Sequence, residues 1–80
     1  MKIGIYCIKD NVAGFLQPTF EMYEASALRN FSYAVSQPSL MNFKPEDYSL
    51  WHLGEYDTDT GVLDPVEPRL IVHATEVISK

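Results

Sequence analysis

The chain has 80 residues, enough for one small domain with a thin margin of stability. Its net charge is −5, and its six lysines and arginines are scattered along the sequence, which argues against binding nucleic acid by neutralising many phosphates. Cys7 is the only cysteine, so a disulfide within the chain is excluded. A lone cysteine in an apolar run is typical of a reducing cytosol and predicts a small buried side chain. We expect a single domain over residues 1–80.

The first apolar run, MKIGIYCIKD, predicts a strand over residues 2–9. It is interrupted by Gly4 and ends at Lys9 and Asp10, so it is too short for a signal peptide or a membrane span. The sequence therefore predicts a cytoplasmic protein with no membrane partner.

A turn and then the clearest helix follow. The segment KDNVAG has turn composition, and Pro18 makes residues 15–22 an edge strand or an irregular lead-in. Apolar residues then recur at helical spacing on one face of residues 23–36, and Pro38 stops this helix. The residues of that face are Ala27, Leu28, Phe31, Ala34 and Val35.

The second half of the chain reads mainly as strands. Residues 37–47 form a loop that is too apolar to be fully solvated, so at least one of its apolar side chains should pack under the domain. Strands are predicted over residues 48–56 and 69–79, with a short strand or loop over 62–68. This order predicts an α+β fold, with one helix packed on a small, mainly antiparallel sheet of three to five strands.

The segment GEYDTDTG, residues 54–61, raises the question of a cation site because it holds three acidic residues. An EF-hand loop that starts at Asp57 would need glycine at its sixth position and glutamate at its twelfth, where Val62 and Pro68 stand. Asp and Thr side chains bond nearby backbone amides, and Gly61 adopts a positive φ at little cost. We therefore expect a hairpin turn.

Other patterns for catalysis or metal binding are weak. His52 and His73 are predicted to share one sheet face, but no further ligand stands at metal-binding spacing. The sequence has no glycine-rich phosphate loop and no Ser-His-Asp pattern. We expect neither an enzyme nor a bound metal or cofactor.

A single helix covers one side of the sheet, so the other side should expose apolar residues, which usually marks an interface. The residues assigned to that side are Tyr6, Ile8, Leu50, His52, Tyr56, Ile71 and Val77. Self-association through this face as a homodimer is the favoured interpretation. Coverage by the loop 37–47 and stacking of nucleic-acid bases on Tyr6, Tyr56 or Trp51 are the alternatives.

Three stretches carry a resemblance to a known family: ALRNF at 27–31, KPEDYSLWHLGEYDTDTG at 44–61 and LIVHATEVI at 70–78. Their order and spacing resemble the small nonstructural protein of gokushoviruses, single-stranded DNA phages of the Microviridae. The matching positions are Ala27, Arg29, Phe31, Pro45, Glu46, Asp47, Tyr48, Gly54, Tyr56, Asp57, Thr60 and Gly61.

The resemblance implies a DNA-binding accessory protein that acts in single-stranded genome synthesis or packaging, in the cytoplasm of the infected host bacterium. Its partners would be single-stranded DNA, contacted weakly or jointly, or the phage replication or capsid proteins. The residues proposed to contact phosphates are Lys9, Arg29, Lys44 and Arg69, and those proposed to contact bases are Tyr6 and Tyr56.

The net charge of −5 supports an alternative hypothesis. An acidic surface suits a protein–protein adaptor, directed at host or phage proteins, that binds no nucleic acid.

Overall fold

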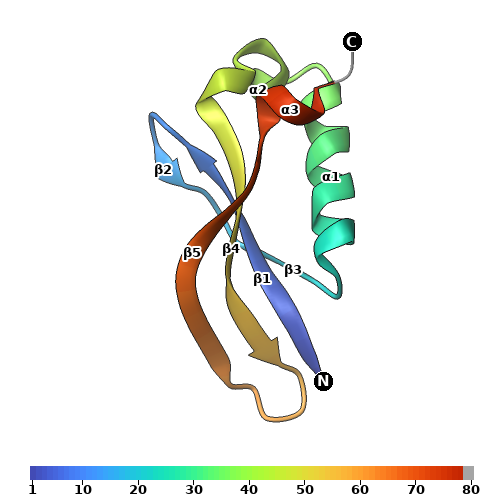
Figure 1. Cartoon of the computed structure of the whole chain (residues 1–80), viewed down its shortest axis with the longest axis vertical. Coiled ribbons are helices and arrows are strands. Elements are labelled where there is room, and N and C mark those ends of the chain that lie inside the picture. The colour runs from blue at the N-terminus through green and yellow to red at the C-terminus, as the bar shows by residue number, and fades with distance from the viewer. Residues whose placement is uncertain (79–80) are drawn as a thin grey trace.

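Five strands form one antiparallel sheet in the computed structural model, which describes residues 1–78 (Figure 1). The strands are β1 (Lys2–Asp10), β2 (Gly14–Phe15), β3 (Thr19–Glu21), β4 (Tyr48–Asp57) and β5 (Leu63–His73). β1 pairs with β4 on one side and with both β2 and β3 on the other, and β5 extends the sheet beyond β4.

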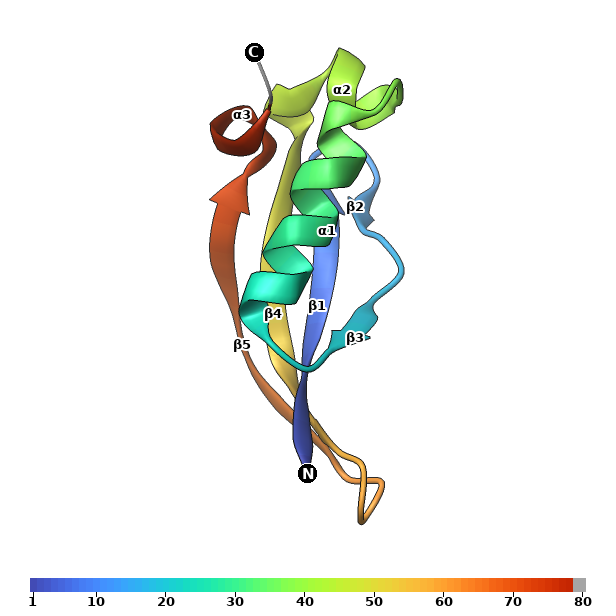
Figure 2. The ribbon, with the colours of Figure 1, turned by 90° about the vertical axis from the view of Figure 1, so that its right-hand side faces the viewer.

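The main helix, α1 (Glu24–Ser36), lies across one face of this sheet (Figure 2). Short helical turns gather near its C-terminal end: α2 (Leu40–Phe43), the 3-10 turn η1 (Pro45–Asp47) and α3 (Ala74–Val77). This arrangement confirms the predicted α+β fold.

The hydrophobic core lies between α1 and the two central strands. Ala27, Phe31 and Val35 are four residues apart, so they share one face of α1. They pack on Tyr6 of β1 and Leu50 of β4. Apolar burial in this layer is what holds the helix on the sheet.

The sequence-based assignment of the two sheet faces is wrong for most of its residues. Tyr6 and Leu50 lie in the core under α1, and Ile8, Ile71 and Val77 pack against that core. Strand alternation separates residues into two faces, but it does not say which face the helix covers.

The faces of His52 and Tyr56 depend on a bulge in β4. His52 lies beside the Tyr6 ring, with 5.3 Å between the ring centroids, and therefore on the α1 side. The pairing of β1 with β4 shifts between Ile5 and Tyr6, which reverses the alternation along β4. Tyr56, paired with Ile3, consequently lies on the face away from α1.

Gly54 occupies this bulge, where β4 and β5 approach closely. A Cβ atom at Gly54 would lie 2.6 Å from the carbonyl oxygen of Asp64. Such a contact is too short for any side chain, so the bulge requires glycine.

The C-terminal part of the chain differs from the expectation of a strand over 69–79. β5 runs continuously from Leu63 to His73, and α3 then begins at Ala74. The His73 N–H donates a hydrogen bond of 2.9 Å to Oε1 of Glu76, which satisfies a donor at the start of the helical turn. Ser79, the last residue of the expected strand, lies outside the described residues.

The segment 37–47 forms α2 and η1 instead of an irregular loop. Its Ser39 hydroxyl accepts a hydrogen bond of 3.2 Å from the Asn42 N–H at the start of α2. Met41 packs against the core, as expected of one apolar residue here, whereas Leu40 and Phe43 are exposed. The segment packs at the end of α1 and does not cover the face away from α1.

At the end of the sheet farthest from α2 and α3, the strands extend past α1 (Figures 1 and 2). β4 and β5 continue there to the turn at residues 58–62, and β5 is exposed from Leu63 to Leu70. Among residues 1–78, no helix covers either face of this end of the sheet.

Phe31→Ala tests the core. Truncating this side chain, which is 3% exposed, should lower the free energy of unfolding by about 3–5 kcal/mol in urea denaturation, because burial is lost and a cavity is left. Tyr33→Ala on the same helix is the control, since Tyr33 is 68% exposed and should cost far less. Equal losses in the two variants would contradict this position of the core.

Candidate nucleic-acid interface

The sheet face away from α1, here called the open face, is apolar and aromatic. It consists of the side chains at paired strand positions opposite to those in the core. Its residues are Ile3, Ile5, Cys7, Lys9, Phe15, Phe20, Ser49, Trp51, Gly54, Tyr56, Leu63, Pro65, Leu70 and His73.

One end of the open face carries a cluster of two aromatic rings and one cation. Phe15 and Trp51 meet edge to face, with 5.7 Å between their ring centroids. The Lys9 ammonium lies 5.4 Å from the centroid of each of these two rings. This distance is within the range of cation–π attraction, so the rings hold a positive charge beside their own surfaces.

Strand pairing and one side-chain hydrogen bond place the three side chains of this cluster. Gly14 has a φ of 94°, and the turn it completes pairs Phe15 with Lys9 across β1 and β2. The indole Nε1–H of Trp51 donates a hydrogen bond of 2.8 Å to the hydroxyl of Ser49, which orients the Trp51 ring. The cluster is therefore built on strands and not on a free loop.

Cys7 lies beneath this end of the open face. Its thiol is within hydrogen-bonding distance of the Leu16 carbonyl oxygen, at 3.1 Å, and the residue is 2% exposed. Burial raises the pKa of the Cys7 thiol, which keeps it protonated. The expectation of a small buried side chain is confirmed.

A second aromatic pair lies farther along the same face. Phe20 of β3 and Tyr56 of β4 also meet edge to face, with 5.5 Å between their centroids. Phe20 is 50% exposed. Ile5 pairs with Phe20, and Ile3 pairs with Tyr56, so β1 lies between β3 and β4 and the two rings meet over β1.

The acidic side chains are concentrated away from the open face. Within the described strands, every Asp and Glu at a paired position lies on the α1 side: Asp10, Glu21, Glu55, Asp57 and Asp64. Glu67 falls where the β4–β5 register shifts, between Pro65 and Arg69. The net charge of −5 is thus unevenly distributed over the two sheet faces.

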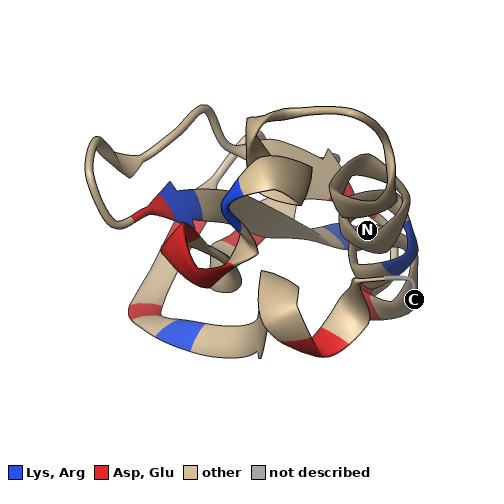
Figure 3. Cartoon of the chain, turned by 90° about the horizontal axis from the view of Figure 1, so that it is seen from above, with Lys and Arg blue, Asp and Glu red and all other residues tan. Residues whose placement is uncertain are grey.

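The residues expected to contact nucleic acid do not form one site, and Figure 3 shows the Lys and Arg positions of the chain spread over the ribbon. Lys9 and Tyr56 lie on the open face. Arg69 forms an ion pair with Glu24 on the α1 side. The guanidinium donates a hydrogen bond to the Glu24 carboxylate, which raises the pKa of Arg69. Lys44 lies 3.8 Å from a Glu46 carboxylate oxygen, and Arg29 is exposed on α1.

Tyr6 is placed in the core and not at a surface. It is 4% exposed, and burial raises the pKa of its hydroxyl, with Glu24 and Glu55 acting in the same direction. A base therefore has no access to the Tyr6 ring in this structure.

The aromatic residues that sequence reasoning missed come from the segment after the first turn. Phe15 and Phe20 are on different short strands, separated by Pro18, so no single period joins them. Their only signal was the presence of two aromatic residues in a segment expected to be an edge strand. Pairing with β1 brings both to the open face.

The acidic segment 54–61 completes β4 and forms the hairpin turn. The Asp59 N–H donates a hydrogen bond of 2.9 Å to the Asp57 carboxylate, and Gly61 has a φ of 75°. The Met1 ammonium forms ion pairs with Asp57 and Asp59. These contacts confirm the predicted turn.

Residues 1–78 contain no group of three or more His, Cys, Asp and Glu side chains arranged to hold a metal. His52 and His73, expected on one face, pair with Arg69 and Ser49 and lie on opposite faces.

The turn makes stability depend on pH through Asp57. The Asp59 N–H hydrogen bond, helped by the Met1 ammonium, lowers the pKa of the Asp57 carboxyl. A lowered folded-state pKa stabilises the fold above the ordinary carboxyl pKa, and this is lost as the pH falls through the lowered value. Asp57→Asn should therefore lower the melting temperature near neutral pH but not in strong acid.

Thermal denaturation across a pH series measures this difference. Glu67→Gln, which neutralises an exposed acid on β5, is the control and should leave the melting temperature nearly unchanged at each pH. A difference between wild type and Asp57→Asn that persists unchanged into strong acid would exclude the charge as its cause.

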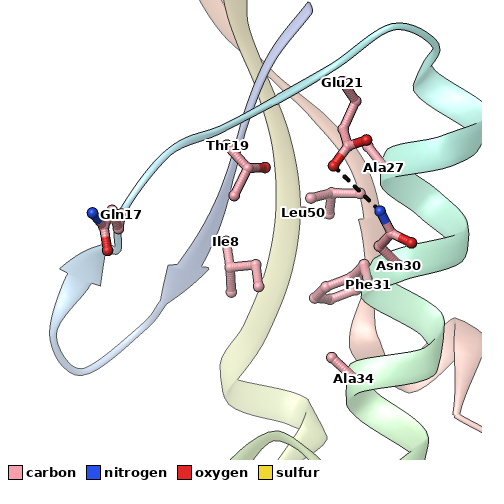
Figure 4. Close-up of a pocket in the computed structure, with 9 residues that line it drawn as sticks. All are labelled: Ile8, Gln17, Thr19, Glu21, Ala27, Asn30, Phe31, Ala34 and Leu50. Carbon is pink, nitrogen blue, oxygen red and sulfur yellow. Dashed lines mark hydrogen bonds between the residues drawn. The ribbon is translucent and has the colours of Figure 1, made fainter.

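A separate cavity of about 260 Å³ lies on the α1 side of the sheet (Figure 4). Its apolar wall includes Ile8, Phe31 and Leu50, contributed by β1, α1 and β4. At its rim, the Asn30 amide donates a hydrogen bond of 3.2 Å to the Glu21 carboxylate. With a carboxylate at its rim, this cavity is a poor place for a phosphate.

None of the helices in residues 1–78 has the length and hydrophobicity required to cross a bilayer. A protein-family model described as Phage ORF5 protein matches residues 3–77, nearly the entire chain. No curated protein and no solved structure matches it.

Proposed function

Because the chain belongs to the Phage ORF5 protein family, we propose that it is a nonstructural phage accessory protein that binds single-stranded DNA through the open face. Its task is single-stranded genome synthesis or packaging in the cytoplasm of the infected bacterium. The resemblance of its motifs to the gokushovirus protein supports this narrower assignment.

The observation that carries the proposal is the Lys9 ammonium 5.4 Å from the centroids of both Phe15 and Trp51. Single strands expose base faces and phosphates together, so a binding site needs aromatic surface next to positive charge. Phe15 is 44% exposed and supplies accessible aromatic surface. Stacking on such rings is tolerant of sequence because every base has a π-face.

The charge distribution supports the same face. A chain of net charge −5 repels DNA at long range, so its affinity should be low and should fall as salt weakens the contact of Lys9 with phosphate. Because the acidic residues at strand-paired positions lie on the α1 side, the open face is the sheet face that repels phosphates least. Weak binding fits a protein that handles DNA together with replication or capsid proteins.

Trp51 is the only tryptophan and therefore reports on the site directly. Titration with oligothymidine at low salt should quench its fluorescence and raise the anisotropy of labelled DNA. Phe15→Ala should weaken binding by about 1–3 kcal/mol through lost stacking. Lys9→Gln should weaken it and lower the dependence of log affinity on log salt by about 0.7 for one phosphate.

Phe43 and Lys44 provide a matched control at another place on the chain. The Lys44 ammonium lies 6.0 Å from the centroid of the exposed Phe43 ring, on a segment away from the open face. Phe43→Ala and Lys44→Gln should leave binding nearly unchanged. Absence of binding at low salt would reject the proposal, as would equal losses from the two pairs of variants.

Sedimentation of the same variants tests the competing interpretation of this face as a protein-binding surface. If the open face serves only homodimer formation, the wild-type protein should sediment as a dimer and Phe15→Ala as a monomer, and neither protein should bind DNA. That result would replace the DNA-binding proposal with the protein–protein one.

A further inference from the structure

We infer that the open face holds two base-stacking positions on one strand of DNA, the first at Phe15 and Trp51 and the second at Phe20 and Tyr56. This inference rests on the proposed function and goes beyond it by assigning a path and a minimum length to the bound strand.

The pairing of the strands sets the distance between the two positions. Phe15 pairs with Lys9, and Phe20 pairs with Ile5 on the same strand. The two positions are therefore four residue steps apart along β1, which is about 13 Å at the rise of a β-strand. This span corresponds to about four stacked nucleotides at 3.4 Å each, so one short oligonucleotide reaches both.

The two positions are similar in construction. Each pairs a half-exposed phenylalanine, contributed by an edge strand beside β1, with a partly buried aromatic ring of β4. Between them, the open-face position on β1 is the buried Cys7, and no acidic side chain stands at a paired position. A DNA strand that runs along β1 from one pair of rings to the other therefore meets no carboxylate at these paired positions.

Only the first position has a described cation at its rings. Lys9 lies over Phe15 and Trp51, so a phosphate is held at that end and the second position contributes stacking alone. The second position should consequently add affinity without adding salt dependence. Linking two such contacts on one strand raises the affinity of long oligonucleotides over short ones.

Phe20→Ala tests the inference, using a thymidine dinucleotide and an oligothymidine of about ten nucleotides. The dinucleotide is too short to join both positions. Phe20→Ala should weaken binding of the long oligonucleotide by about 5-fold to 150-fold while leaving its salt dependence unchanged. It should leave quenching of Trp51 by the dinucleotide unchanged.

Tyr23→Ala is the matched control, because Tyr23 is an exposed aromatic residue three positions away at the start of α1. It should leave both affinities unchanged, and thermal denaturation should show both variants folded. If Phe20→Ala leaves the long oligonucleotide as tightly bound as wild type, or weakens both lengths equally, the second position is rejected and the first stands. If neither length binds wild type, the proposed function fails as well.

Discussion

The rest of this structure depends on burial of the apolar stripe of α1 against a single face of the sheet. Phe31 and Val35 belong to one core with side chains of β1, β4 and α3, and the chain provides no second helix of comparable length in its described residues. Burying one face of a five-stranded sheet leaves the other to be solvated or bound. The aromatic residues on that other face are therefore left without a helix to cover them.

Charge is the second constraint, and it follows the same division of the sheet. Acidic residues at paired positions share the α1 side, where Glu24 of α1 also meets Arg69 of β5. On the open face, by contrast, the Lys9 ammonium lies beside the rings of Phe15 and Trp51. A formal charge of −5 is a property of the entire molecule, whereas a ligand contacts one surface and responds to the charges nearest to it.

Local patterns predicted α1, β1 and β4 well, because helical spacing over 23–36 and alternation over 2–9 and 48–56 are strong periodic signals. They assigned Tyr6 and Leu50 to the wrong face, since alternation is symmetric until the position of the helix is known. The sequence placed His52 and Tyr56 on one face, and the bulge beside Gly54 puts them on opposite faces, a change that one inserted residue makes and no average property reveals. The cluster at Lys9 was out of reach for another reason, because Phe15 reaches it by pairing across a turn.

The end of the sheet beyond α1 should unfold locally more easily than the rest of the molecule. Residues 63–70 of β5 are exposed, and their backbone is held by β4 alone, so little apolar burial opposes their separation. Amide hydrogens there should exchange with solvent much faster than those of β1 and β4 beneath α1, because local fraying needs less free energy than global unfolding. The hairpin tip and the helix-covered layer therefore behave as units of different stability within one continuous sheet.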